Sequence, residues 1–381
     1  MYPALPLSDP SWARRTVAEL DAFGREYRAE LHDHERAGQF PRDLYVEMGR
    51  NGWAGLIVPK RFGGLGLGVP EYALLAEEIG RHGLASIQTA VQGQLWLLDW
   101  GTEEQQRDLL PGLASGETVF AEAISEPGVG SSLKLMGATA RRDGSDWIID
   151  GRKTHVNLGD DCDLMIVYAV VPDEGLSAFL LERPSPGLST RKTEPIGLRL
   201  IPTADVELQG VRVPANGLLG PVGGGLKTFL STFNVSRIGN ASELIGLGRR
   251  AMAQAIDYAH ERKVGDNVVT EFQGIRWTVA EAHTKLYAAA LARDLAARRA
   301  VEGADISLDT SLAKRLAIDA AEYAANECFA LTGGYGLYRD RDFARILDDV
   351  KVLRVAGGSS EVLRNYVARR VIDDPELGGL R

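Results

Sequence analysis

The sequence predicts an α+β fold in which a helical domain, an antiparallel β domain and a four-helix bundle follow one another along 381 residues. Three changes along the chain support this prediction. Up to residue 118, apolar residues recur every three or four positions, which is typical of helices with one buried face. Residues 119–223 contain short runs rich in Val, Ile and aromatic side chains, separated by Gly, Pro and Asp turns. From residue 224 to 381 the chain is rich in Ala and regains the helical spacing.

The N-terminal α-helical domain, residues 1–118, is predicted from two segments in particular. PEYALLAEEIGRHG at 70–83 and TEEQQRDLLPGLASG at 102–116 place apolar residues at helical spacing, broken by Gly and Pro. The central β domain, residues 119–223, is predicted from the runs VFAEAIS, DWIIDG, DLMIVYAVV, LSAFLLE and ADVELQGVRVP. The composition of the chain offers ample material for a large core, and two or three structural domains are expected.

The C-terminal helical bundle domain, residues 224–381, is predicted from four long periodic stretches. They cover 226–263, 272–303, 308–331 and 341–372, and each is expected to be one helix. Four long helices joined by short connections favour a bundle.

Composition and charge exclude several kinds of partner. The net charge is −9, and acids and bases are interspersed, so nucleic acid is not an expected partner. No apolar run approaches the ~18 residues of a membrane span, and the N-terminus lacks a basic segment followed by an apolar one. A cytoplasmic protein is therefore expected. Cys162 and Cys328 are far apart and lack ligand-like neighbours, so both are expected to be packing residues, with no metal site.

Six segments in order carry the functional signal. The first, AEAISEPGVGSS at 121–132, ends a predicted strand in a turn whose backbone N–H groups can converge on an acceptor such as the edge of a flavin ring. Taken alone, it is an ordinary Pro-Gly turn. The other five are GRKTHVNLGD at 151–160, RIGNASELIGLGRRAMAQAIDYAHERK at 237–263, EFQGIRWTVAE at 271–281, LTGGYGLYRD at 331–340 and DVKVLRVAGGSSEVLRNYVARRVI at 349–372.

Together these segments resemble the acyl-CoA dehydrogenase family across nearly the whole chain. The resemblance implies helical, β and four-helix-bundle domains in that order, with FAD held between the β domain, the bundle and a neighbouring subunit. A homodimer or homotetramer is therefore expected, with a heteromer as an alternative. Carried over position by position, the resemblance implies a set of cofactor-binding residues: Ile124, Ser125, Gly130, Ser131, His155, Asn157, Arg262, Gln273, Gly333, Gly334, Ser359 and Glu361.

The chain departs from the family at the catalytic base. The family's usual base is a Glu within a Tyr-Glu-Gly-Thr run, and the matching segment here places Gly357 at that position. A second position used by some members, just before the arginine that opens the first bundle helix, holds Ser236. The backbone N–H of Gly357 can still polarise a thioester carbonyl, so Gly357 stays a catalytic candidate.

Three other titratable side chains are candidates for the missing base. Glu243 lies seven residues after Ser236, two turns along the same helix face, and is the favoured candidate. Glu122 and His155 are weaker ones, and a structural role is an equally good reading of His155. The expected substrate-binding residues are Phe233, Asn234, Ser236, Arg237 and Asn240, whose polar groups favour a short or polar acyl chain.

The sequence therefore predicts an FAD-dependent dehydrogenase-like oxidoreductase that acts on an acyl thioester of coenzyme A or an acyl carrier protein. Its expected electron acceptor is an electron-transfer flavoprotein. Two alternatives stay open: a repurposed flavin oxidase or hydroxylase of specialised metabolism, and a non-catalytic subunit of a heteromeric acyl-CoA dehydrogenase.

Overall fold

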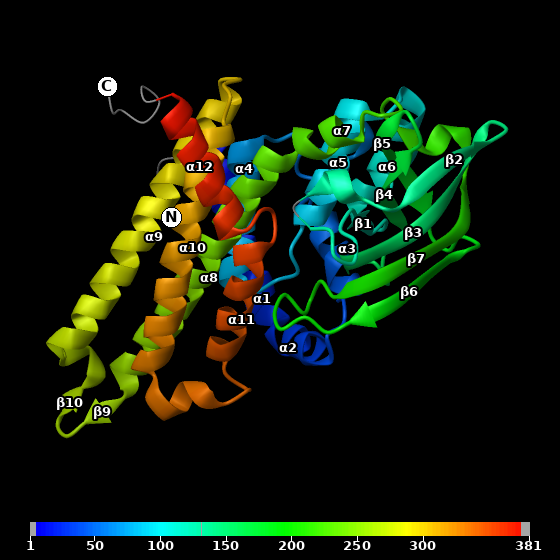
Figure 1. Ribbon diagram of the computed structural model, residues 1–381. Helices are drawn as coiled ribbons and strands as arrows, with labels where there is room; N and C mark the ends of the chain where they lie inside the picture. The colour runs from blue at the N-terminus through cyan, green and yellow to red at the C-terminus, as the bar shows by residue number, and fades with distance from the viewer. Residues whose placement is uncertain (1–4, 131, 375–381) are drawn as a thin grey trace.

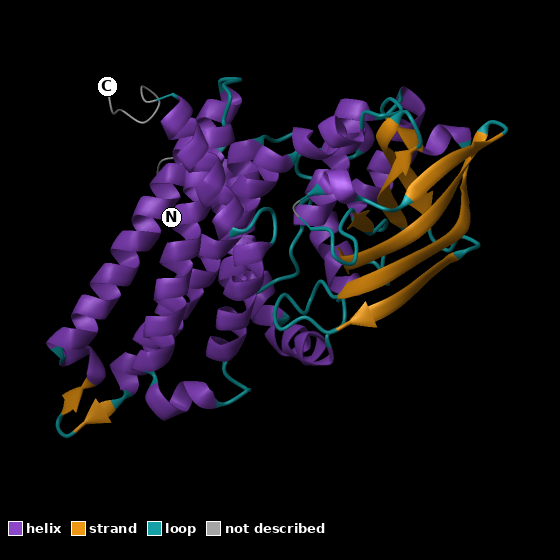
Figure 2. Ribbon diagram, viewed as in Figure 1, coloured by secondary structure: helices purple, strands orange, loops and turns teal. Residues whose placement is uncertain are grey.

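The computed structural model describes residues 5–130 and 132–374, so Ser131, one of the predicted flavin-binding residues, lies outside the described residues. Helices and strands separate in space: a long helical body lies on one side and a curved sheet on the other (Figures 1 and 2). Shorter helices from the N-terminal part of the chain lie between the sheet and the bundle and also cover one face of the sheet. The predicted order of helical, β and helical regions is confirmed.

Helices form the N-terminal region. The predicted segments 70–83 and 102–116 are confirmed as α4 and α6, which end at Gly83 and Gly116, both with a left-handed φ. Side chains fix two of the starts: Asp9 caps α1, and Thr102 and Gln105 form a capping box on α6. The helices are α1 (Pro10–Glu26), α2 (Arg28–Ala37), α3 (Arg42–Arg50), α4 (Val69–His82), α5 (Gln88–Trp100) and α6 (Glu103–Ser115).

The β domain contains an eight-stranded sheet in the order β6-β7-β3-β2-β4-β5-β8, with β1 paired to β4 outside this path. Most neighbours are antiparallel, as predicted, but β1 runs parallel to β4, and β2 meets β4 in parallel at one position. The purely antiparallel prediction is wrong there, because side-chain alternation reports which face is buried and not strand direction. The strands are β1 (Phe120–Ala123), β2 (Thr139–Asp143), β3 (Asp146–Asn157), β4 (Leu164–Val171), β5 (Gly175–Glu182), β6 (Leu188–Thr193), β7 (Thr203–Val213) and β8 (Leu218–Leu219).

The C-terminal region is a bundle built around α8 and α10. The fourth predicted helix, 341–372, is wrong as a single element, because the chain breaks between α11 and α12. Gly357 and Gly358 adopt φ values of +65° and +96°, which end a helix, and Ser359 caps the next one. The elements are α7 (Gly225–Ser231), α8 (Phe233–Glu261), β9 (Lys263–Val264), β10 (Asn267–Val268), α9 (Gln273–Val301), α10 (Ser307–Leu331), α11 (Asp342–Val355) and α12 (Ser360–Asp373).

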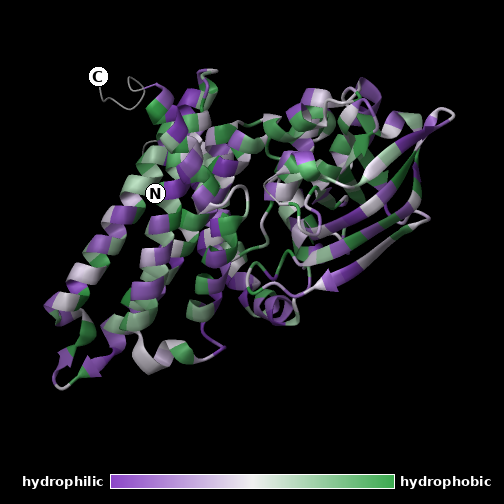
Figure 3. Ribbon diagram, in the orientation of Figure 1, coloured by the Kyte–Doolittle hydropathy of each residue, from purple (hydrophilic) through white to green (hydrophobic). Residues whose placement is uncertain are grey.

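Helix α4 joins the N-terminal region to the bundle by packing along α8 (Figure 1). The two backbones approach so closely that Gly80 and Gly246 have no room for a Cβ atom against the opposite helix. Apolar side chains alternate with polar ones along the strands and helices, as Figure 3 shows by colour. Cys162 and Cys328 are buried and unpaired, as expected for packing residues.

Candidate active site

The loop between α11 and α12, residues 356–359, forms one wall of the candidate site and lies on the side of the bundle that faces the β domain (Figure 1). Lys314 of α10 anchors this loop by hydrogen bonds. Its Nζ atom donates to the carbonyl oxygen of Gly358 at 2.9 Å and to that of Ala356. Within the described part of the chain, the N–H of Gly357 has no hydrogen-bond acceptor, so it stays available to a ligand.

An amide occupies the space in which a side chain on residue 357 would begin. A Cβ atom on Gly357 would lie 2.6 Å from Asn240 Nδ2 and 3.4 Å from Lys314 Nζ. The same Nδ2 donates to the carbonyl oxygen of Ser236 at 2.9 Å, which fixes the amide in this place. Ser236 and Asn240 therefore lie on one face of α8, and a side chain at position 357 would require the Asn240 amide to shift.

Arg237 lies beside the same loop. Its guanidinium carbon is 4.6 Å from the centre of the Phe233 ring and 5.9 Å from that of Tyr366. Its Nη1 atom donates to Ser311 Oγ on α10 at 3.2 Å. Four of the five predicted substrate-binding residues therefore gather at the loop: Phe233, Ser236, Arg237 and Asn240.

Asn234, the fifth predicted substrate residue, turns toward α10, where its Nδ2 donates to Ser307 Oγ at 3.1 Å. Sequence reasoning missed Lys314, which is fully buried. No motif marks it, because a lone Lys in an Ala-rich helix ordinarily faces solvent.

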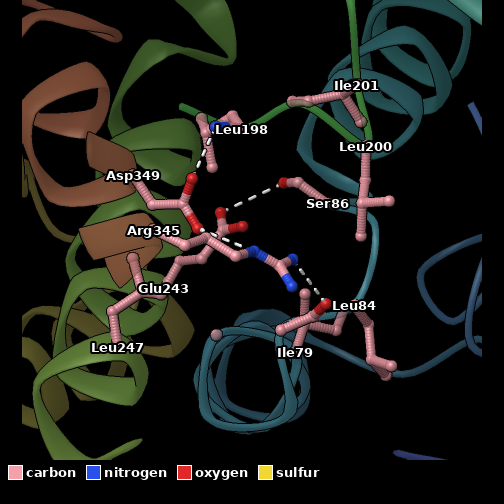
Figure 4. Close-up of a pocket in the computed structure, with 12 residues that line it drawn as sticks. Ile79, Leu84, Ser86, Leu198, Leu200, Ile201, Glu243, Leu247, Arg345 and Asp349 are labelled. Atoms are coloured by element: carbon pink, nitrogen blue, oxygen red, sulfur yellow. Dashed lines mark hydrogen bonds and ion pairs between the residues drawn. The ribbon is translucent and has the colours of Figure 1, made fainter. Parts of the chain in front are cut away.

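Glu243 lies in different surroundings from Gly357. Its carboxylate accepts hydrogen bonds from Ser86 Oγ at 3.0 Å and from Gln88 Nε2, both in the segment that opens α5. It lines a small cavity with Leu198, Arg345 and Asp349 (Figure 4). Burial raises the pKa of Glu243 to about 7, and the neighbouring Asp349 acts in the same direction. Glu243 is therefore a carboxyl able to exchange a proton near neutral pH.

Glu122 on β1 is a second carboxyl with a raised pKa. Burial raises its pKa to about 8, and its Oε1 atom is buried without a hydrogen-bond partner among the described residues. The neighbouring Tyr168 ring packs edge-on against Phe229, and Phe229 packs against Phe233 at 5.2 Å between centroids. These ring contacts link the surroundings of Glu122 to those of Arg237, which packs on Phe233.

The first group of predicted flavin residues lies where β1 leaves the sheet. The N–H of Thr154 donates to the carbonyl oxygen of Ser125 at 2.9 Å, which brings the first and second motifs together. His155 follows at a bulge of β3, exposed and with a φ of +57°. Ile124, Ser125 and Asn157 are half-buried, and Gly130 is exposed. An exposed imidazole beside half-buried backbone fits the edge of a planar ring.

The second group lies at the end of the bundle that carries the β9–β10 hairpin. Arg262 and Gln273 flank this hairpin, and both are exposed. Tyr258 stacks on Tyr335 at 4.6 Å, which brings the Gly333–Leu337 turn to the same end. A Cβ atom on Gly333 or Gly334 would meet nothing within 4 Å, so a flat ring can approach the backbone.

Two further cofactor candidates, Ser359 and Glu361, lie at the start of α12. Ser359 Oγ accepts from the N–H of Val362, and Glu361 pairs with Arg354 at 3.3 Å. The hairpin end of the bundle lies apart from the β domain in Figure 1, so the two groups are not brought together within one chain. The described residues contain no helix long and apolar enough to span a membrane, and no cluster of three metal-ligand side chains.

Comparison with known proteins gives the family of the chain. Models of the acyl-CoA dehydrogenase N-terminal, middle and C-terminal domains match residues 13–117, 121–211 and 223–372. The chain is 33% identical to an acyl-CoA dehydrogenase of Bacillus subtilis, over 89% of this chain and 92% of that protein. It is 32% identical to a subunit of the caffeyl-CoA reductase-Etf complex of Acetobacterium woodii, over 91% and 94%.

The solved structure of butyryl-CoA dehydrogenase from Megasphaera elsdenii superposes with a TM-score of 0.91 at 26% identity, covering 97% of this chain and 100% of that one. The chain belongs to the acyl-CoA dehydrogenase family, whose members are FAD-dependent oxidoreductases acting on the CH–CH bond of acyl-CoA. FAD is the cofactor of this family, and the two groups of residues described above fit its flavin and adenine ends.

Proposed function

We propose that the protein is an FAD-dependent oxidoreductase for the CH–CH bond next to the carbonyl of a short or polar acyl thioester, carried by coenzyme A or an acyl carrier protein. The loop at Gly357 carries this proposal. Its N–H has no acceptor within the described chain, and the Lys314 ammonium fixes the carbonyl groups on both sides of it. A fixed N–H of this kind stabilises negative charge that develops on a carbonyl oxygen.

Bound FAD supplies the acceptor for the β-hydrogen, and the side chains supply the rest. Gly357 polarises the thioester carbonyl through its N–H. Glu243 is our proposed base for the α-proton, since burial raises its pKa to about 7. Because Ser86 and Gln88 hold its carboxylate two helical turns from Ser236, the proposal includes a proton relay between the α-carbon and Glu243. Phe233, Ser236, Arg237 and Asn240 are proposed to bind the acyl group, whereas Asn234 turns toward α10 and is not included.

Anaerobic mixing with a panel of short acyl thioesters tests this function. Bleaching of the bound flavin without oxygen uptake is expected. Rapid oxygen uptake with a hydroxylated or oxidised product would favour the oxidase or hydroxylase alternative instead. Absence of flavin from the chain expressed alone, and its appearance with a homologous partner, would favour the non-catalytic subunit.

Purified protein is expected to contain FAD and not FMN. Our proposal assigns the adenine and pyrophosphate ends to residues that only a dinucleotide can reach together with the flavin edge. Denaturation followed by chromatography of the released flavin checks this, and release of FMN alone would contradict it. The proposed cofactor residues are Ile124, Ser125, Gly130, Ser131, His155, Asn157, Arg262, Gln273, Gly333, Gly334, Ser359 and Glu361.

We further propose a homodimer or homotetramer in which one chain supplies the flavin end and another the adenine end of each site. Helix α9 supports this, because Leu291 and Leu295 lie one turn apart on its outer face and are 41% and 52% exposed. Electron-transfer flavoprotein is the proposed redox partner, as for the relative from Acetobacterium. A cytoplasmic location and domain boundaries at 118/119 and 223/224 belong to the same proposal.

The double variant Leu291→Glu/Leu295→Glu is expected to dissociate into monomers and to lose FAD together with the assembly. Two carboxylates buried in an apolar interface are costly, whereas in the monomer they remain hydrated. Light scattering and flavin absorbance of the same sample measure both effects. Ile196→Glu, at a position outside α9 that is also exposed, at 63%, is the control and should change neither. A monomeric wild-type protein that holds FAD would contradict the shared site.

A further inference from the structure

Two buried cations beside the loop at 356–359 lack a carboxylate partner among the described residues. Lys314 is fully buried, and its two acceptors are uncharged carbonyl oxygens. Arg237 is 8% exposed, its neighbours are rings and hydroxyl or amide groups, and its Nε atom is buried without a hydrogen-bond partner. Burial and the charge of Arg237 lower the pKa of Lys314 to about 7, as expected for an ammonium without a counter-charge.

The other buried cations among the described residues are paired. Arg293 contacts Asp294 at 2.6 Å, Arg250 contacts Asp342, and the fully buried Lys153 contacts Glu126 at 2.8 Å. A buried charge that lacks its partner is strongly unfavourable. The pair at the loop is therefore the place in the described structure where an anion from outside the chain is most needed.

The resemblance to the family accounts for the missing charge. At position 357, relatives carry the carboxylate of the usual base, and this chain carries only a hydrogen atom. Apart from the loop's own backbone, the polar atoms nearest to this position are donors, Asn240 Nδ2 and Lys314 Nζ. Gly358 lies close to the same guanidinium, because a Cβ atom there would lie 3.9 Å from Arg237 Nη2.

We propose that the acyl group itself carries the missing carboxylate, so that the substrate is the monothioester of a short dicarboxylic acid. Arg237 contacts this carboxylate, and Lys314 adds its charge from beneath the loop. The carboxylate lies only a few bonds from the thioester carbonyl, since the Gly357 N–H and Arg237 adjoin the same loop. This inference rests on the proposed function and narrows its substrate class.

Binding of matched ligands to the FAD-loaded protein tests the inference without turnover. The ligands are succinyl-CoA, glutaryl-CoA and the monomethyl ester of each, and calorimetry gives the dissociation constants. At least one free acid is expected to bind about tenfold or more tightly than its ester, because a charge-assisted hydrogen bond to arginine is lost on esterification. Equal affinity of acid and ester would overturn the carboxylate site and leave the thioester function standing. Binding of none of the four would remove both.

Two variants test whether Arg237 and Lys314 cause the preference for the free acid over its ester. Arg237→Gln and Lys314→Met are expected to bring the acid-to-ester ratio close to one. Arg315→Gln is the matched control, since Arg315 neighbours Lys314 in sequence but pairs with Asp319 outside the cluster, and its ratio should equal that of the wild type. A preference that survives both Arg237→Gln and Lys314→Met would overturn the assignment. The wild-type ratio decides the matter even where a variant fails to fold.

Discussion

The double variant Gly357→Glu/Asn240→Ala is expected to oxidise a short uncharged thioester such as butyryl-CoA about 10²- to 10⁴-fold faster than the wild type, the contribution of a positioned general base. Glutamate at 357 stands where the family usually carries its base. The single change Gly357→Glu should gain less, because its Cβ atom would lie 2.6 Å from Asn240 Nδ2 and its backbone would keep a φ of +65°. Removing the amide at position 240 clears the space.

Anaerobic flavin bleaching in a stopped-flow instrument measures this gain. Asn240→Ala alone and Gly357→Gln/Asn240→Ala are the matched controls, since neither adds a titratable group. They measure the effect of removing the Asn240 amide by itself, and the double variant with glutamate should exceed both. The new carboxylate should also neutralise Arg237 and Lys314, so the double variant is expected to lose the preference for free acids over esters. A folded, FAD-bound double variant with no gain would show that the α-carbon is not presented to position 357.

The arrangement of domains could be predicted because each region has its own hydrophobic period. The hydrophobic period does not show where a helix ends if the spacing of apolar residues continues past that end. The stretch 341–372 keeps helical spacing across Gly357 and Gly358, and only the left-handed conformation of these residues divides it into two helices. Strand direction is hidden in the same way, because the parallel pairing of β1 with β4 depends on the path of the chain between them.

The part of the candidate site that lies on one helix, α8, could be predicted from the sequence. Asn240 follows Ser236 by four residues and Arg237 by three on α8, so their common surroundings follow from helical phase. Lys314 comes from α10, more than seventy residues later, and only the packing of α10 against α8 brings it under the loop. Phase also misleads over longer distances. Glu243 shares the face of Ser236, but two turns on, about 10 Å along the axis, that face meets the start of α5 instead.

Glu243→Gln is expected to slow anaerobic flavin reduction by substrate by at least about a hundredfold, with FAD content and fold retained. Glutamine keeps the size of the side chain and can still accept from Ser86 and Gln88, but it takes no proton. Since a base acts in its ionised form, the wild-type rate should rise with pH through about 7, the pKa to which burial raises Glu243. This limb of the pH profile should be absent in the variant.

The pH dependence of stability is an independent test of the raised pKa of Glu243. A carboxyl whose pKa is raised by folding binds its proton more tightly when folded, so its ionisation destabilises the protein as pH rises from the unfolded value of 4.5 to about 7. Glu243→Gln removes this penalty. The melting temperature of the variant should therefore equal or exceed that of the wild type at pH 8. At pH 5 the difference between the two melting temperatures should be less favourable to the variant.

Glu122→Gln is the matched comparison, because Glu122 is the other carboxyl that the candidate region keeps partly protonated near neutral pH, with a pKa of about 8. If Glu243 takes the α-proton, Glu122→Gln should keep most of the activity and the limb near pH 7. The reverse result, in which Glu243→Gln keeps its activity and Glu122→Gln is slowed, would identify Glu122 of the β domain as the base. Equal rates in all three proteins would exclude both carboxyls, and would leave the substrate's own carboxylate or the His155 imidazole as the group that handles the proton.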